Sequence, residues 1–210
     1  TFRKNAIIQN GFIKKDEKGK LLRDNLFGSE KEDIQRRDIT INSLLYDPNK
    51  RVIIDYFDGF DDIKNKKIKV IGDPKKRFIE DPMRIIRIIR ISSKLNLQID
   101  DKLSRIMMAN LDSIKDIPSS RLFDEICKMF TNGHAVSCID MLFDYDVLKI
   151  LVPRLSVLMR NKKNLDKMKK FLMASDQRFE KKLTISISFV LSSLFWIFFK
   201  DEFKVSLKKN

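Results

Sequence analysis

The chain has 210 residues and a mass of 24.8 kDa, which is enough for one large or two small domains and too short for three. A 43% apolar fraction with sixteen phenylalanines excludes wholesale disorder, because such a chain can bury a sizeable core. The formal charge of +14 and the pI near 9.7 indicate a polyanionic partner, either nucleic acid or an acidic membrane surface, unless the protein is simply basic.

The cysteines and the histidine exclude further classes. Cys127 and Cys138 lack CxxC spacing, so we expect two reduced core thiols rather than a zinc knuckle or a disulfide framework. The single histidine, His134, follows Gly133 and is predicted to be a turn residue. We therefore do not expect catalysis by a histidine-based triad.

The distribution of glycine divides the predicted elements. All six glycines lie within the first 133 residues, so a mixed α/β part precedes a helical part. Short runs rich in Ile, Val and Phe predict strands at 2–8, 51–55 and 67–71, and the polar residues 14–24 predict a mobile loop. Helical spacing predicts helices at 82–96, 100–112, 119–131, 135–144 and 146–152, followed by two or three more to the end.

Neither end of the chain predicts a membrane segment. Residues 183–199 carry no charge but include four serines, and they fall short of the roughly twenty apolar residues that a bilayer requires, so we expect a buried core helix. The first residues show neither an initiator methionine nor the apolar run of a signal peptide. We therefore expect a cytoplasmic chain that starts inside a longer protein.

A first polar constellation follows Ser29, which has the spacing of a capping box with Glu32. The pattern predicts a helix that runs on through Asn42, with Asp38 and Asn42 on one face at the edge of an apolar stripe. These two side chains either bind neighbouring backbone groups and hold a loop, or border a nucleotide cleft in which Arg37 offers a bidentate fork to phosphate.

A second constellation is sharper. Asp81 is a natural N-cap before Pro82, and Arg84, Arg87 and Arg90 continue a slanted stripe at a spacing of three residues. The remaining positions are mostly Ile or Met, which predicts a buried helix. Arginines on such a helix line a cleft for a triphosphate or a base edge, meet partner carboxylates, or reach ordinary surface.

In order and spacing, four stretches resemble a known family, the bacterial class II nucleotidyltransferases that comprise poly(A) polymerase I and the CCA-adding enzymes. They read LLRDNLFGSEKEDIQRRDITINSLLYD, DYFDGFDDI, KVIGDPKKRFIEDPMRIIRIIR and RLFDEICKMF. The resemblance implies an α+β fold, with part of a polymerase-β-like nucleotidyltransferase head followed by an all-helical neck and body. It divides the chain into a head at 1–78, a neck at 79–152 that recognises the base and binds RNA, and a body at 153–210.

The same resemblance implies roles for individual residues. Arg37 and Asp38 match the motif that contacts the nucleotide's phosphates and ribose, and Asp38 is the expected catalytic residue. Asp81 and Arg84 match the pair that reads the base. Asn42, Arg87 and Arg90 complete the expected nucleotide-binding set.

The family also implies Mg²⁺ bound by two aspartates spaced D-x-D after a Gly-Ser pair. Here Asp38 follows Gly28-Ser29 at the first of these positions, but Thr40 occupies the second. We therefore expect no metal ligand in this chain and place the D-x-D carboxylates upstream of Thr1.

The implied function is template-independent addition of AMP from ATP to RNA 3′ ends, with mRNA or tRNA as substrate. The stretch LLRDNLFGS and the RLFDE helix favour the poly(A) polymerase branch. A CCA-adding tRNA nucleotidyltransferase and a non-catalytic RNA-binding module remain the alternatives. The sequence predicts no membrane partner and no particular oligomeric state.

Overall fold

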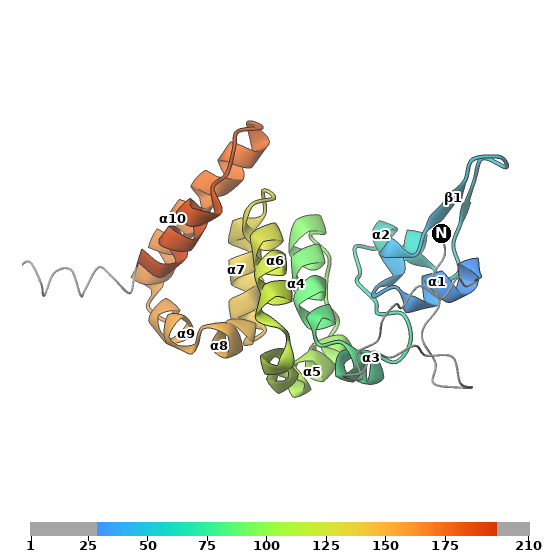
Figure 1. The fold of residues 1–210 in the computed structure, drawn as a ribbon, viewed down its shortest axis with the longest axis horizontal. Coiled ribbons are helices and arrows are strands. Elements are labelled where there is room, and N and C mark those ends of the chain that lie inside the picture. Colours follow the sequence, from blue (N-terminus) through green and yellow to red (C-terminus); the bar gives the residue numbers. More distant parts are fainter. Residues whose placement is uncertain (1–28, 197–210) are drawn as a thin grey trace, which may run out of the picture. The chain divides into compact units, whose positions relative to one another are not determined.

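A computed structural model of the protein describes residues 29–196, so the predicted strand at 2–8 and the loop at 14–24 lie outside the described residues. The chain divides into two compact units, one ending at Asp73 and one beginning at Pro74 (Figure 1). The first unit mixes helices and strands and the second is helical, which confirms the predicted fold class.

The described part of the first unit contains short elements. They are α1 (Glu30–Arg36), the 3-10 helix η1 (Thr40–Asn42), β1 (Leu45–Asp47), β2 (Val52–Ile54) and α2 (Gly59–Lys64). The predicted capping box is confirmed at the start of α1, where the Ser29 hydroxyl accepts from the Glu32 amide and the Glu32 carboxylate accepts from the Ser29 amide.

The predicted helix through Asn42 is wrong. Helix α1 ends at Arg36 and the chain turns extended at Arg37, whose φ and ψ are −63° and 158°. The Thr40 amide donates to the Lys69 carbonyl at 3.1 Å and the Ile71 amide to the Asp38 carbonyl at 3.3 Å. This long-range pairing and the β-branched Ile39, whose backbone is extended, interrupt the helix before the short 3-10 turn η1. Asp38 and Asn42 therefore do not share a helical face.

The pairing around Ile39 also builds the core of this unit. Ile39 and Val70 form an isolated antiparallel bridge, and Lys67 is a second bridge residue, so the continuous strand predicted at 67–71 is wrong. Five isoleucines are buried around it: Ile34, Ile39, Ile41, Ile68 and Ile71.

Strands β1 and β2 form an antiparallel hairpin in which Leu45 pairs with Ile54 and Asp47 with Val52. The prediction of a strand at 51–55 is confirmed, whereas β1 was not predicted. After β2, the Asp55 carboxylate accepts hydrogen bonds from the amides of Phe57, Gly59 and Phe60. The turn that leads into α2 therefore uses Asp55 as its cap.

The second unit is built from helices throughout its described length. They are α3 (Pro74–Glu80), α4 (Met83–Leu95), α5 (Asp101–Ala109), η2 (Leu111–Asp116), α6 (Ser119–Phe130), α7 (Ala135–Asp144), α8 (Val147–Leu151), α9 (Pro153–Met159) and α10 (Lys162–Glu180). The five helices predicted between 82 and 152 are confirmed by α4, α5, α6, α7 and α8, with ends that differ by three residues or fewer.

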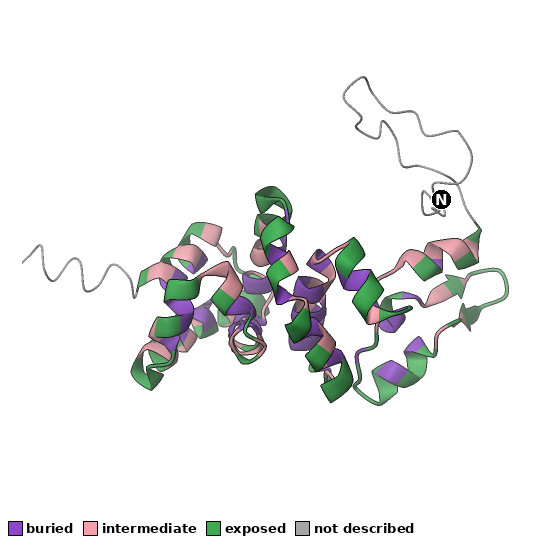
Figure 2. Ribbon diagram, turned by 90° about the horizontal axis from the view of Figure 1, so that it is seen from below, coloured by how far each residue is buried: buried purple, intermediate pink, exposed green. Residues whose placement is uncertain are grey.

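Helix α4 packs against α6 and α7, while α7 packs in turn against α8 and α10 (Figure 1). The buried surface runs through these middle helices (Figure 2). On α4 it consists of Met83, Ile85, Ile86, Ile88, Ile89, Ile91, Ser92 and Ser93. The predicted burial of this helix is confirmed, with its arginines left half-buried at the edge of the apolar surface.

A last helix covers 187–196, within the segment predicted as a buried core helix. Val190 and Leu194 are buried, whereas Phe189 and Trp196 are exposed. Between Ser29 and Trp196, no helix has the length and apolar character needed to cross a membrane.

Candidate nucleotide-binding site

The predicted site residues fall in both units. Arg37, Asp38 and Asn42 belong to the first unit; in the second, Asp81 lies just before α4 and the three arginines lie along it. Each group has its own hydrogen-bond network.

Arg37 follows the last residue of α1. Its guanidinium donates from Nη1 to the backbone oxygen of Asn42 and from Nη2 to the Asp33 carboxylate at 3.3 Å. The side chain is 36% exposed, so part of the fork faces solvent. The fork lies at the surface, where a phosphate can reach it, and also holds the turn that contains Asp38.

Asp38 lies in the extended segment whose backbone pairs with Ile71. It is half-buried, and Asn42 is exposed at the end of η1. Asn42 contributes its backbone oxygen to Arg37, which is the loop-holding interpretation of this residue.

The buried carboxylate of Asp62 contacts this segment. Asp62 of α2 is 2% exposed, accepts from the Thr40 hydroxyl at 2.7 Å and pairs with the Lys69 ammonium. The hydrogen bond to Asp62 raises the pKa of Lys69 above its ordinary value. Thr40, where the family pattern has an aspartate, is therefore a structural contact of a buried carboxylate.

Asp81 lies two residues before α4, and Pro82, not Asp81, occupies the N-cap position, so the predicted N-cap is displaced by one residue. The Asp81 carboxylate still accepts from the Met83 amide at 3.3 Å, and its carbonyl accepts from the Arg84 amide at 3.1 Å. The same carboxylate binds Arg121 of α6, whose Nη2 lies 3.2 and 3.0 Å from the two oxygens. The Asp81 side chain is 23% exposed and so reaches solvent beside this contact.

The guanidinium of Arg84, in the first turn of α4, is held by two acceptors. Its Nη1 donates to the Arg77 carbonyl at 2.7 Å and to the Glu80 carboxylate at 3.1 Å. Arg77 of α3 also donates to the Glu80 carboxylate, at 3.2 Å. Glu80 thus links the end of α3 to the first turn of α4 and holds the guanidinium of Arg84.

Arg90 meets a partner carboxylate. Its Nε donates to Glu125 of α6, and Lys128 lies 3.3 Å from the other oxygen of that carboxylate. Glu125 is nearly buried, with 5% of its side chain exposed. Arg87 is half-buried between Arg84 and Arg90 on the stripe.

Two residues of α6 were missed by sequence reasoning. Arg121 and Glu125 stand four residues apart, so they share a helical face, and that face bonds to Asp81 and Arg90 of α4. The i, i+4 spacing of opposite charges in RLFDE was a usable signal for an exposed pair. It gave no indication that the partners of both residues lie on α4.

The arrangement pairs a carboxylate acceptor, Asp81, with a cationic donor, Arg84, at the start of one rigid helix. Such a pair can match the donor and acceptor pattern on the edge of a nucleobase. The two side chains are already oriented by Arg121 and Glu80, so little ordering is needed on binding.

The described residues do not fit a metal. Within 29–196, no group of three or more His, Cys, Asp or Glu side chains could hold an ion. The sequence does contain one D-x-D triplet, Asp144-Tyr145-Asp146, which corrects the expectation that it is lacking. This triplet lies at the turn between α7 and α8, where burial raises the pKa of Asp144. It follows no Gly-Ser pair and so is not the motif described above.

Two stretches of the chain match family models. Residues 1–69 match "Poly A polymerase head domain", and residues 96–159 match "Probable RNA and SrmB- binding site of polymerase A". Among solved structures, one titled "tRNA-processing enzyme (apo form I)" is 28% identical, with a TM-score of 0.65 over 80% of this chain and 46% of that chain. Fold and site thus define a nucleotidyltransferase head followed by a helical RNA-associated unit.

Curated relatives fall in the same class. Poly(A) polymerase I of Haemophilus influenzae is 34% identical over 200 residues, which cover 94% of this chain and 44% of that protein. A CCA-adding enzyme of Lactobacillus helveticus is 36% identical over 113 residues, 54% of this chain and 28% of that enzyme. The chain belongs to the class II nucleotidyltransferase family of poly(A) polymerases and CCA-adding enzymes. It spans less than half the length of these curated relatives.

Proposed function

We propose that this chain is the nucleotide-selecting and RNA-binding part of a template-independent RNA nucleotidyltransferase that adds AMP from ATP to RNA 3′ ends. The observation that carries this proposal is the oriented pair of Asp81 and Arg84 at the start of α4. The similarity to a poly(A) polymerase I over 94% of the chain, against 54% for a CCA-adding enzyme, favours the poly(A) branch.

In this proposal the second unit selects the base. The Asp81 carboxylate accepts from an exocyclic amine while the Arg84 guanidinium donates to a ring nitrogen or a carbonyl. Arg87 and Arg90 support the stripe, and Arg90 does so through Glu125. Hydrogen bonding to a base edge discriminates strongly, because a wrong base leaves buried polar groups unpaired.

The first unit contacts the rest of the nucleotide. Arg37 binds its phosphates, Asp38 contacts ribose and phosphates as the proposed catalytic residue, and Asn42 completes this group. In the reaction, the RNA 3′-oxygen forms a bond to the α-phosphorus of ATP, the bond between the α- and β-phosphates breaks, and pyrophosphate leaves. The family resemblance implies Mg²⁺ for this step, but residues 29–196 do not fit it, and we assign its ligands upstream of Thr1.

In this proposal the partner of the positively charged chain is RNA. A charge of +14 favours binding to phosphates, with 3′ ends of mRNA or tRNA as substrates. We propose that the protein acts in the cytoplasm.

Two alternatives have specific support. A CCA-adding enzyme is favoured by the solved structural neighbour titled "tRNA-processing enzyme". A non-catalytic RNA-binding module is favoured by the match of residues 96–159 to an RNA-binding family model.

The test is nucleotide addition by the protein supplied with the upstream segment of its family. We expect an adenosine run on diverse RNAs, and expect Asp38→Asn and Arg84→Lys to lower the rate or change the nucleotide used. Lys115→Gln, which breaks only an exposed pair with Asp112, is the control. A single C-C-A on tRNA would identify the CCA-adding alternative. RNA binding without addition, together with no effect of ATP on thermal stability, would identify the binding module.

A further inference from the structure

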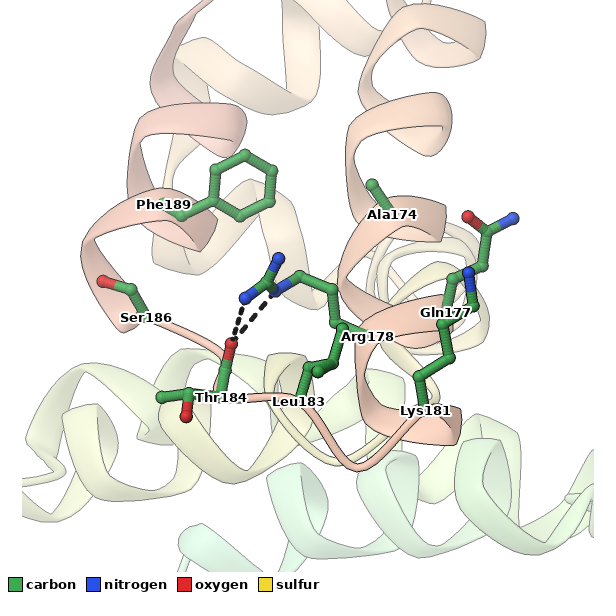
Figure 3. A pocket seen from close by; sticks show the side chains of 8 residues that line it. All are labelled: Ala174, Gln177, Arg178, Lys181, Leu183, Thr184, Ser186 and Phe189. Carbon is green, nitrogen blue, oxygen red and sulfur yellow. Dashed lines mark hydrogen bonds between the residues drawn. The ribbon is translucent and has the colours of Figure 1, made fainter.

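A pocket of about 620 Å³ lies beside the C-terminal half of α10 and the segment that follows it (Figure 3). One side is formed by Gln177 and Arg178 of α10 with Lys181 directly after it, and the other by residues that include Leu183 and Phe189. This pocket lies outside both stretches that match the family models, 1–69 and 96–159.

The guanidinium of Arg178 is fixed in this pocket. Its Nε and Nη2 donate to the Thr184 carbonyl at 3.0 and 2.8 Å, which also holds the chain as it leaves α10. The third nitrogen, Nη1, has no hydrogen-bond partner among the residues that the structure describes. Arg178 therefore presents a preorganised positive charge at low entropic cost.

The remaining lining combines positive charge with apolar surface. Lys181 has no ion-pair partner within 29–196, and no carboxylate among the described side chains lines the pocket. Leu183 and Phe189 are 49% and 42% exposed, and Figure 3 shows the Phe189 ring on the opposite side of the pocket from Lys181. An exposed aromatic ring beside unpaired cations suits a flat ring that carries an anionic group.

We propose that this pocket binds one nucleotide of the single-stranded RNA substrate, with its base against Phe189 and its phosphate at Arg178 and Lys181. Aromatic stacking and a cationic groove are the two devices by which proteins hold single-stranded nucleic acid without reading its sequence. The inference rests on the proposed function and deepens it, because it adds an RNA contact on α10 that is separate from the base-selecting residues of α4.

The test measures binding of a 5′-labelled adenosine oligonucleotide to the whole chain by fluorescence anisotropy over a series of salt concentrations. Lys181→Gln is expected to weaken binding and to reduce the slope of log K against log salt by about 0.7, the value for one phosphate contact on a single strand. Phe189→Leu is expected to weaken binding about fivefold at unchanged slope, because it removes stacking and keeps the charge.

The matched control is Lys162→Gln, which removes the same charge from the first turn of α10, about 28 Å along the helix from Lys181. It is expected to change the affinity less than about twofold, because it touches no phosphate in the pocket. Thermal melting of each variant verifies folding, and Arg178 is left intact because it holds the Thr184 carbonyl.

The outcomes separate the two proposals. If the wild-type chain shows no salt-dependent RNA affinity, the proposed function itself fails. If the wild type binds and both pocket variants behave like Lys162→Gln, the pocket inference is overturned and the proposed function stands. Crosslinking of the wild type to an oligonucleotide with 4-thiouridine gives a readout that needs no variant. An adduct between 174 and 189 supports the pocket, and adducts confined to other residues overturn it.

Discussion

Arg121 of α6 donates to both carboxylate oxygens of Asp81, at 3.2 and 3.0 Å, across a separation of 40 residues in sequence. Asp81 therefore has two partners, because the same carboxylate also accepts a hydrogen bond from the Met83 amide at the start of α4. A nucleobase that bonds to Asp81 must share it with both groups.

Arg121→Gln is expected to reduce discrimination between ATP and CTP about tenfold, because the carboxylate loses a charged hydrogen-bond partner that orients it. The ratio of kcat/KM values for the two nucleotides measures this effect. The free energy of unfolding should change by less than about 1 kcal/mol, since the pair is partly exposed. Lys115→Gln serves as the control, and an unchanged ratio in Arg121→Gln would show that Arg121 plays no part in selection.

Glu125→Ala is expected to lower the free energy of unfolding by about 3 kcal/mol, because it leaves the mostly buried Arg90 without its carboxylate. Urea denaturation of the whole chain measures this loss. Lys128→Gln removes the exposed partner of the same carboxylate and should cost less than about 1 kcal/mol. Equal losses in the two variants would contradict a buried role for the Arg90 pair.

Gly133→Ala is expected to destabilise the turn between α6 and α7 by more than about 1 kcal/mol. Gly133 has a φ of 78°, and an added Cβ would lie 2.4 Å from Cδ1 of Phe179 on α10. Denaturation of the single variants and of Gly133→Ala/Phe179→Ala separates the two causes. The double variant should recover the loss due to the clash and keep the loss due to φ, and additive losses would contradict the contact.

The stability of the protein is expected to decrease as the pH is lowered, because His134 then takes up a proton. Burial lowers the pKa of this histidine below its ordinary 6.5, so the unfolded chain binds the proton more readily than the folded chain. The contribution of neutral His134 to stability is therefore fully present above pH 6.5, and it is lost as the pH falls from there toward the lowered pKa. The thermal midpoint followed from about pH 8 to about pH 5 measures this loss.

His134→Gln should flatten this pH dependence, and a curve unchanged from the wild type would contradict the prediction.

Asp55 titrates in a separate, more acidic pH range. Partial burial alone would raise its pKa, but the amides of Phe60, Gly59 and Phe57 hold the pKa below its ordinary 3.8. Its contribution is present above pH 3.8 and is lost as pH falls through the lowered value.

Local signals predicted the helical unit well. Asp81, Pro82 and the run of isoleucines predicted the start and the burial of α4 to within two residues, because such signals act locally. Ser29 predicted the start of α1 for the same reason. Its end was not predictable, because it depends on backbone pairing between 38–40 and 69–71, some thirty residues away.

The candidate site shows the same division. The stripe of Asp81, Arg84, Arg87 and Arg90 was predictable from spacing, and one of the three alternatives, that the arginines meet carboxylates, describes Arg84 and Arg90. The identity of the second partner, Glu125, depends on how α6 packs against α4, which no local pattern encodes. Roles in binding nucleotide remain predictions for all seven residues.

The contacts of α10 determine where the C-terminal boundary of an expressed fragment can be placed. The match to the RNA-binding model ends at residue 159, before α10 begins. Asp176 of α10 nevertheless accepts from the amides of Ala135 and Val136 at 2.7 and 3.1 Å, and Ser175 donates to the Phe130 carbonyl at 3.0 Å. An expression boundary placed at the end of the match would remove the cap of α7, so a fragment meant to carry the RNA-binding stretch has to extend through α10.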